Sequence, residues 1–328
     1  MNQVENEADK INRRHFITRV TKACLSIAGA CALGYFFYDP NGPKGSQDES
    51  LVSVPDFSMP EVGKKMAVVR GSSRRETLPK AFEAIGGIET FIKRGDRVLL
   101  KVNAAFASPP MLSATTHPDL IAQCIELCYR AGAEKVFVTD NPINDPAACF
   151  NLSGIESAVK SAGGKLVFPK NNYFRSTSVK GGSLIQNWPL LFEPLDGITK
   201  LIGMTPVKSH QRSGASMTMK NWYGLLGGHR NIFHQDIHNT IKELSMMVKP
   251  TLVILDGTTA MMTNGPTGGA LSDLKNTETM IVSTDQVAAD AFGCSLLNLE
   301  VRDLPYISKA AEAGSGTADY ESLKPVII

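Results

Sequence analysis

The stretch "RVLLKVN" at residues 97–103, with "HPDLIAQCIELCYRAGA" at 117–133 and "KVFVTD" at 135–140, decides the fold class. The first and last pieces are short runs rich in Val and Leu, which is typical of strands buried on both faces. The middle piece predicts a helix, with Thr116 as a candidate N-cap and Pro118 in its first turn. Strand, helix and strand in this order predict two parallel strands joined by a crossover helix.

The same alternation continues on both sides of this unit. Strands are predicted at 66–70, 165–169, 198–208, 251–257 and 279–285, and helices at 77–94, 153–163, 234–248 and 286–299. Residues 170–195 are loop-rich and predict an inserted hairpin or small subdomain. The sequence therefore predicts an α/β fold, a mainly parallel sheet with helices on both faces.

The N-terminus carries the whole formal charge of +2, since the remaining 306 residues hold 29 basic and 29 acidic side chains. A neutral body excludes nucleic acid as an expected partner. An arginine pair, Arg13 and Arg14, precedes a charge-free run at 23–38. The string resembles a twin-arginine signal, which implies the twin-arginine export machinery as a partner. An ordinary secretory signal or a single anchor is the alternative.

Three regions follow from this pattern. Residues 1–38 are a twin-arginine-like signal or N-terminal anchor, 39–62 a proline-rich linker or surface arm, and 63–328 the α/β domain. The expected location is the periplasm or the outer face of the cytoplasmic membrane, with a possible membrane tether through residues 23–38.

The cysteines do not form a ferredoxin-type cluster motif, because the sequence has no CxxC. Cys124 and Cys128 lie one helical turn apart, on the face that Ile121 and Ile125 share. They are predicted to be buried core thiols, with a disulfide or a soft-metal pair as alternatives. The cofactor, if there is one, stays unknown.

Polar residues follow several predicted strands, and ligands of such sheets bind beyond the carboxyl ends of the strands. In addition, residues 197–235 contain no acidic side chain but five cations and three histidines. Unbalanced positive charge favours an anionic partner, although scattered surface ion pairs are the alternative. The predicted ligand-binding side chains are those of Lys101, Asn103, Lys208, Asn221, Arg230 and His234.

Two residues of this segment, Lys220 and His210, are the candidate acid/base catalysts. Arg230 is expected to hold the anion in a bidentate contact. The loop at 257–269, which is not a Walker A motif, adds backbone N–H groups near Gly265 and Gly268. Asp256 stands before it as a possible acid/base or cation ligand, and a purely structural turn is the alternative.

"HQDIH" places His234 and His238 four residues apart, the spacing by which zincins bind zinc on one helical face. Gln235 replaces the glutamate base of that motif, so no metal site is predicted there and ordinary hydrogen bonding of the two imidazoles is favoured. No GxSxG motif is present, so a serine hydrolase is not expected.

Several segments together, "VLLKVN", "VKSH", "MTMKNWYGLLGGHRNIFH", "KPTLVILDG", "NGPTGG" and "STDQVAADAFG", resemble the domain-of-unknown-function 362 family. The resemblance implies an α/β fold, frequent export and an association with iron–sulfur proteins, but no established chemistry. Thr263 departs from the family, which usually has glutamate there. The portion from 99 to 133 also resembles, loosely, the first domain of nickel-pincer lactate racemases. The predicted function is an exported protein that binds an anionic small molecule or cofactor, as an oxidoreductase or isomerase; the alternative is a non-catalytic accessory protein of a membrane-associated redox system.

Overall fold

The computed structural model describes residues 13–37 and 51–328, which fall into two units, Met1–Gln47 and Asp48–Ile328. Helix α1 (Arg13–Phe37) occupies the first unit and contains the predicted arginine pair. None of the helices within the described residues is both long enough and apolar enough to cross a membrane. Tyr38 and the first part of the predicted linker, residues 39–50, lie outside the described residues.

The second unit contains one large sheet whose strand order is β11-β1-β10-β9-β7-β2-β3-β4, with β8 paired to β7. Most neighbours are parallel; β10 is antiparallel to both β1 and β9, and β8 is antiparallel to β7. The predicted mainly parallel α/β sheet is therefore confirmed. The strands are β1 (Met66–Arg70), β2 (Arg97–Lys101), β3 (Lys135–Thr139), β4 (Lys165–Val167), β7 (Lys200–His210), β8 (Gly214–Ser216), β9 (Leu252–Met261), β10 (Leu274–Ser283) and β11 (Val326–Ile327).

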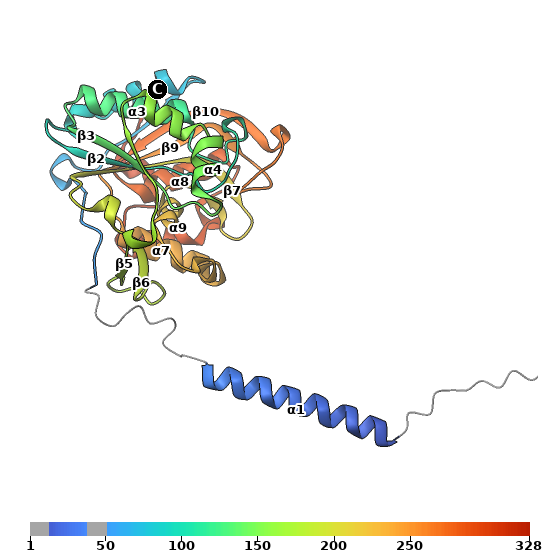
Figure 1. Cartoon of the computed structure of the whole chain (residues 1–328). Coiled ribbons are helices and arrows are strands. Elements are labelled where there is room, and N and C mark those ends of the chain that lie inside the picture. Colours follow the sequence, from blue (N-terminus) through green and yellow to red (C-terminus); the bar gives the residue numbers. More distant parts are fainter. Residues whose placement is uncertain (1–12, 38–50) are drawn as a thin grey trace, which may run out of the picture. The chain divides into compact units, whose positions relative to one another are not determined.

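Helices cover both faces of this sheet (Figure 1). Alternate residues of one strand show it: Val98 and Leu100 of β2 pack among α2, α3 and α5, whereas Leu99 packs among α6 to α9. This alternation follows from the two-residue period of a strand. The helices of the second unit are α2 (Arg74–Ala84), α3 (Pro118–Arg130), α4 (Pro146–Leu152), α5 (Ile155–Ser161), α6 (Thr218–Asn221), α7 (Ile237–Met247), α8 (Gln286–Leu296) and α9 (Pro305–Glu312).

The insert at 170–195 contains a two-stranded antiparallel sheet of β5 (Phe174–Thr177) and β6 (Trp188–Leu191), as predicted. Residues 51–62, the described part of the predicted linker, pack on the body. Val52 pairs with Thr177, and Phe57 is buried and donates its N–H to the carbonyl of Lys249.

Two predicted helices differ from the structure. The helix predicted at 77–94 ends at Ala84, because Gly86 and Gly87 adopt φ of 106° and 84°, which continue no right-handed helix. The helix predicted from residue 234 begins as a 3-10 helix, η7 (Arg230–Asp236), and becomes α-helical only at Ile237.

The structure contradicts the predicted N-cap of α3 and confirms the predicted burial of two cysteines. Asp285 caps α8 by accepting hydrogen bonds from the backbone N–H groups of Val287 and Ala288. The N-cap of α3 is His117 and not Thr116, whose hydroxyl instead donates to the carbonyl of Met204. The four cysteines of the second unit are buried and free, which confirms the burial predicted for Cys124 and Cys128.

Candidate functional site

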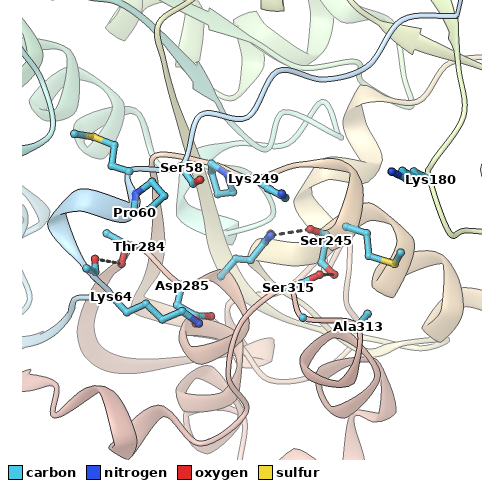
Figure 2. A pocket seen from close by; sticks show the side chains of 16 residues that line it. Ser58, Pro60, Lys64, Lys180, Ser245, Lys249, Thr284, Asp285, Ala313 and Ser315 are labelled. Carbon is cyan, nitrogen blue, oxygen red and sulfur yellow. Dashed lines mark hydrogen bonds and ion pairs between the residues drawn. The ribbon is translucent and has the colours of Figure 1, made fainter.

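A wide surface hollow, about 710 Å³, lies at the amino-terminal edge of the sheet (Figure 2). Its three lysines, Lys64, Lys180 and Lys249, are exposed. Its carboxylate, Asp285, already caps α8 and pairs with Lys64 at 2.7 Å. Exposed lysines and a carboxylate that is already paired do not indicate a binding or catalytic site, so this hollow is not the candidate site.

A smaller cavity, about 250 Å³, lies at the opposite, carboxyl-terminal edge, between β2 and β7. From β2 the chain continues to β3 and β4 on one side, while β7 and β9 lie on the other. The helices that follow these strands cover opposite faces, α3 and α5 on one and α6 and α7 on the other. Strand ends diverge at such a switch point, and α/β proteins bind their ligands there.

The cavity brings together most of the predicted site. Seven predicted residues line it: Asn103, Lys208, His210, Lys220, Asn221, Arg230 and His234. The lining residues that the sequence-based site did not include are Ala105, Phe106, Asp140, Asn141, Ile143, Ser216, Tyr223, Gly224 and Asn231, with Pro266 and Thr267 from the loop after β9. Asp140 and Asn141 carried a signal, because they directly follow the strand β3.

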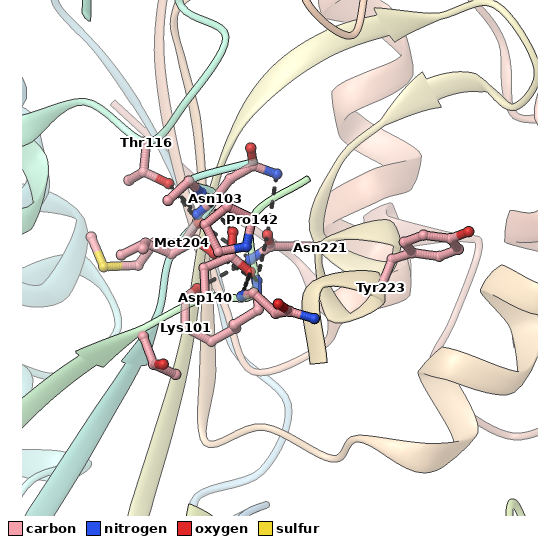
Figure 3. A network of polar contacts seen from close by, with 12 residues as sticks. Lys101, Asn103, Thr116, Asp140, Pro142, Met204, Asn221 and Tyr223 are labelled. Atoms are coloured by element: carbon pink, nitrogen blue, oxygen red, sulfur yellow. Dashed lines mark hydrogen bonds and ion pairs between the residues drawn. The ribbon is translucent and has the colours of Figure 1, made fainter. Parts of the chain in front are cut away.

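A hydrogen-bonded network forms the floor of the cavity (Figure 3). Lys101, which is fully buried, donates to Asp140 at 2.7 Å, to the carbonyl of Val102 at 2.6 Å and to Asn221 at 3.2 Å. Its three N–H groups are therefore used inside the protein, and the structure places it below the cavity and not in its lining. Burial lowers the pKa of Lys101, and the nearby Asp140 carboxylate opposes that shift.

Asn221 connects α6 to the strands β2 and β7. Its side-chain oxygen accepts from Lys101 and Asn103, and its amide N–H groups donate to the carbonyls of Lys101 and Met204. Because these bonds occupy both ends of the amide, Asn221 positions α6 and has little capacity left for a ligand.

The absence of a side chain at residue 224 allows this arrangement. A Cβ atom on Gly224 would lie 2.0 Å from an oxygen of Asp140 and 2.8 Å from Nζ of Lys101. Backbone therefore approaches the buried ion pair directly, which only glycine permits.

Arg230 lines the cavity but does not present a bidentate donor pair to it. Its Nη1 donates to the carbonyls of Tyr223 and Leu226, and its Nη2 to those of Asn141 and Pro142. Since four carbonyls occupy the terminal amino groups, the predicted bidentate contact with an anion is not available. Arg230 instead joins the loop after β3 to the segment after α6 and adds its charge to the cavity.

Two lysines supply the cations that face the cavity. Lys208 is 1 % exposed and donates to the carbonyl of Ala114 at 2.6 Å and to Asn103 at 3.3 Å. Lys220 is 8 % exposed and lies over the ring of Tyr223, 5.1 Å from its centroid. Burial, with the neighbouring charge of Lys220, lowers the pKa of Lys208 to about 7. Burial and the charge of Arg230 lower the pKa of Lys220 to about 8.

The hydrogen bonds of His210 define its tautomer. Nδ1 of His210 accepts from the backbone N–H groups of Arg212 and Ser213, both at 3.2 Å, so the proton of the neutral ring lies on Nε2. Burial and the charge of Lys220 lower the pKa of His210 to about 2, which keeps this ring neutral. His210 is therefore a hydrogen-bond donor through Nε2.

His234 has the opposite tautomer. The hydroxyl of Tyr223 donates its proton to the carbonyl of Arg230 and must accept from Nδ1 of His234, 3.0 Å away. Nε2 of His234 therefore carries the lone pair. Burial and the charge of Lys220 lower the pKa of His234 as well. The rings of His210 and His234 stack with centroids 5.7 Å apart, so a donor and a base lie side by side.

Three further predicted residues, besides Lys101, lie outside the lining. Asp256 pairs with Arg74 at 2.6 Å, because it points to the face of the sheet that carries α2. Gly265 packs on β7, where a Cβ atom would lie 1.9 Å from the carbonyl oxygen of Ser209, and Gly268 lies against Met261. These two glycines shape the loop that brings Pro266 and Thr267 to the cavity.

His238 stacks on Tyr306 and not on the partners of His234, so the two imidazoles of "HQDIH" contact different residues. The change from 3-10 to α-helix between them explains the difference. Within the described residues, no group of three or more histidine, cysteine or acidic side chains is arranged to hold a metal ion.

The cavity continues into two shallower grooves. One, about 500 Å³, shares Asn141, Ile143, Arg230 and Asn231 with it, and the other, about 480 Å³, shares His210, Asn231, His234 and Pro266. The second groove adds the cation Arg212. A ligand that fills the cavity therefore has room to extend along the surface.

The model of one protein family, described as a domain of unknown function (DUF362), matches residues 98–295, more than half of the chain. The chain belongs to the DUF362 family. The matched region contains every strand and helix that contributes to the cavity, from β2 to the loop after β9. The lining is thus part of the DUF362 domain itself.

Two known proteins are similar to this DUF362 chain, one in sequence and one in structure. The thylakoid-associated protein sll1697 of Synechocystis is 26% identical over 252 residues, which cover 73% of this chain and 74% of that protein. The apoprotein of lactate racemase from Thermoanaerobacterium thermosaccharolyticum superimposes with a TM-score of 0.40 and 11% identity. That match covers 75% of this chain and 61% of the racemase, so the chain spans less than two thirds of the length of that protein.

Proposed function

We propose that the cavity between β2 and β7 binds a small organic anion, and that Lys220 with the His210 and His234 pair exchanges protons with it. The reaction class is an isomerisation, or an oxidoreduction with a separate electron carrier. The single observation that carries the proposal is the ammonium group of Lys220, which is buried at the cavity and has no carboxylate partner among the described residues.

The charges around the cavity support an anionic ligand. Lys101, Lys208, Lys220 and Arg230 surround it or lie directly beneath it, whereas Asp140 is the one carboxylate among the described lining residues. Asp140 already pairs with Lys101. Burying unpaired cations is costly, and a bound carboxylate or phosphate would offset that cost.

The two imidazoles support proton exchange. A neutral ring with a free lone pair on Nε2 accepts a proton, and a neighbouring ring with a proton on Nε2 donates a hydrogen bond. His234 and His210 have these two states at one cavity wall. Lys220, with a pKa of about 8, is available in both protonation states near neutral pH.

A non-catalytic accessory protein of a membrane-associated redox system is the second candidate. Its support is the relative sll1697, whose name describes it as thylakoid-associated. We propose for either candidate that residues 1–38 direct export by the twin-arginine route and that the domain works outside the cytoplasm. An iron–sulfur protein would then be a partner, because the chain itself has no CxxC motif.

Calorimetric titration with a panel of small anions, malonate, phosphate and sulfate, tests the proposed binding. We expect the wild-type protein to bind at least one of them at about neutral pH. Lys220→Met, which removes the charge at similar volume, should weaken that binding by about tenfold or more, as the loss of one charge-assisted contact implies.

Lys160→Met is the matched control, since Lys160 is exposed on α5, on the opposite face of the sheet. It should bind like the wild-type protein. Equal affinities for the wild-type protein and the Lys220→Met variant would contradict the assignment of the anion to this cavity.

A further inference from the structure

Among the lysines of the site, Lys220 differs in what its amine contacts. Lys101 and Lys208 donate hydrogen bonds to carbonyls and side-chain oxygens, which occupy their amines. Within the described part of the chain, no oxygen accepts a hydrogen bond from Lys220, and its Nζ lies over the ring of Tyr223. Deprotonation of Lys220 therefore breaks no hydrogen bond and leaves a lone pair beside the cavity.

The surroundings of Lys220 favour the neutral amine. Burial and the charge of Arg230 lower its pKa to about 8, so a substantial fraction is unprotonated slightly above neutral pH. A lysine that is desolvated beside another cation is the arrangement that activates amines for attack on carbonyl groups.

The residues around Lys220 suit a carbonyl compound that also carries an anionic group. Lys208 lies deeper, and its charge together with that of Arg230 attracts a carboxylate. Lys220 and both imidazoles line the same cavity, and the charge of Lys220 lowers the pKa of His210 and of His234. Nε2 of His210 can donate to a carbonyl oxygen, and Nε2 of His234 can accept a proton.

We propose that Lys220 forms a reversible imine with a small 2-oxo acid or aldehyde acid, whose carboxylate lies toward Lys208. The proposal rests on the anion site of the proposed function and adds the substrate class and a covalent step. The amine lone pair forms the N–C bond while the electron pair of the C=O bond moves to oxygen. The nitrogen loses two protons and the oxygen takes up two; the C–O bond then breaks, the nitrogen lone pair forms the C=N bond, and water leaves. The neutral imine takes up one proton from solvent to become the protonated imine. No oxidant or reductant takes part.

The imine would allow proton transfer from a carbon atom of the substrate. A protonated imine withdraws electrons from the neighbouring carbon and acidifies its C–H bond. Nε2 of His234, on the same wall, is positioned to take that proton, and Lys220 is the group that holds the substrate meanwhile. Proton exchange on a carbon acid then needs only residues of this chain.

Reductive trapping of the full-length protein tests the proposal. The protein is incubated with pyruvate and, separately, glyoxylate in the presence of cyanoborohydride, and the adduct is measured by intact mass and located by peptide mapping. We expect one adduct, on Lys220, at a rate about tenfold or more above that of exposed lysines, as its lowered pKa implies. At a saturating concentration of pyruvate, where the weaker binding at high pH no longer limits the reaction, the trapping rate should rise with pH as Lys220 loses its proton.

Lys220→Arg lacks the nucleophilic amine, so it should lose the adduct. Malonate, which has no carbonyl group able to form an imine, reports on the anion site alone. Lys160→Arg should behave like the wild-type protein. An adduct on Lys208, or adducts spread over exposed lysines, would overturn the proposal, as would the absence of any adduct.

Malonate binding separates the two levels of inference. If the wild-type protein binds malonate but gives no adduct, the imine is excluded and the anion site stands. If malonate, phosphate and sulfate all fail to bind, the proposed function itself fails, whatever the trapping experiment gives. An unfolded Lys220→Arg variant, recognised by circular dichroism, is replaced by Lys220→Met, for which the adduct must also be lost.

Discussion

Lys220 opposes folding in the absence of a ligand, because a buried ammonium group without a carboxylate partner has lost its hydration and gained little in return. Two other buried cations of the site are compensated, Lys101 by Asp140 and Arg230 by four carbonyls. Lys208, with a pKa of about 7, shares this cost with Lys220. Residues that destabilise a fold persist at sites where function requires them. Lys220 thus differs from Lys101 and Arg230, a difference that the sequence alone does not reveal.

We therefore expect Lys220→Met to stabilise the ligand-free protein. A folded-state pKa of about 8, below the ordinary value of 10.5, means that the unfolded chain binds more protons between these values, so the wild-type protein gains stability as the pH rises through that range. At about pH 6 the variant should be more stable by on the order of 2 kcal/mol, and the difference should shrink toward pH 10. Urea unfolding at several pH values measures it; a destabilised variant would contradict this explanation.

Anion affinity should have the opposite pH dependence. The ammonium forms of Lys208 and Lys220 attract the ligand, and their pKa values are about 7 and 8. Affinity for malonate should be highest below pH 7 and fall as the pH rises from about 7 to 9, by up to about tenfold per unit for each lysine that loses its proton. A bound anion raises both pKa values, which moves the loss to higher pH.

Titration calorimetry at about pH 7 and pH 9 checks this dependence. The neighbouring imidazoles should contribute little over this range, because the pKa values of His210 and His234 are both lowered. In Lys220→Met the decrease should be shallower, since one of the two titrating amines is absent. A constant affinity across this range would show that neither lysine binds the anion.

At the scale of elements, one buried carboxylate fixes the insert to the body. Glu243 on α7 is fully buried and accepts hydrogen bonds from the backbone N–H groups of Ser183, Leu184 and Ile185. These three N–H donors satisfy the carboxylate, which forms no ion pair with any described residue. The loop between β5 and β6 thus depends on a side chain about 60 residues away in sequence.

Glu243→Gln should destabilise the protein by about 2 kcal/mol, because the amide nitrogen of glutamine faces an N–H group that then lacks an acceptor. Glu126→Gln on α3 is the control, since Glu126 is half exposed and only 3.6 Å from Arg75, and should change stability by less than about 0.5 kcal/mol. Chemical denaturation measures both. Equal effects in the two variants would show that the contact does not anchor the insert.

Element type was predictable where apolar periodicity and strand length agreed, and β1 is predicted with the observed bounds, Met66–Arg70. The full lengths of the longer strands were not predictable. β9 and β10 both continue beyond the predicted runs, as the two arms of one hairpin. The added residues of β10, 274–278, are exposed or half-buried, whereas those of β9, 258–261, are mostly buried but include two threonines. The change of helix type within "HQDIH" was also unpredictable. A spacing of four residues, as between His234 and His238, fits a continuous α-helix as well as a 3-10 helix that becomes an α-helix.

At the scale of the whole molecule, the position of the site followed from topology. Lys208 and His210 end β7, and Asn103 follows β2, so a switch point between these strands brings them together. The hydrogen-bond and ion-pair partner of each side chain could not be predicted from the sequence. Whether Arg230 meets a ligand or four carbonyls depends on the path of distant loops, and so does the pairing of Asp256 with Arg74.

The N-terminal segment allows one further prediction for the whole chain. The arginine pair begins α1, in a unit separate from the α/β domain, so changes there should leave the anion site untouched. Replacing Arg13 and Arg14 together by lysine keeps the charge but removes the feature that the twin-arginine resemblance rests on. We expect the precursor to accumulate in the cytoplasm, folded and with unchanged malonate affinity.

Fractionation of cells that express the wild-type and the double variant measures this, with Lys22→Arg, which also keeps the charge of α1, as the control. The control should be exported like the wild-type chain. Export of the Arg13→Lys, Arg14→Lys variant at the wild-type level would exclude the twin-arginine route. Because that route carries folded proteins, retention of a folded, malonate-binding variant would also place the formation of the cavity before export, so that any cofactor the site holds would be inserted in the cytoplasm.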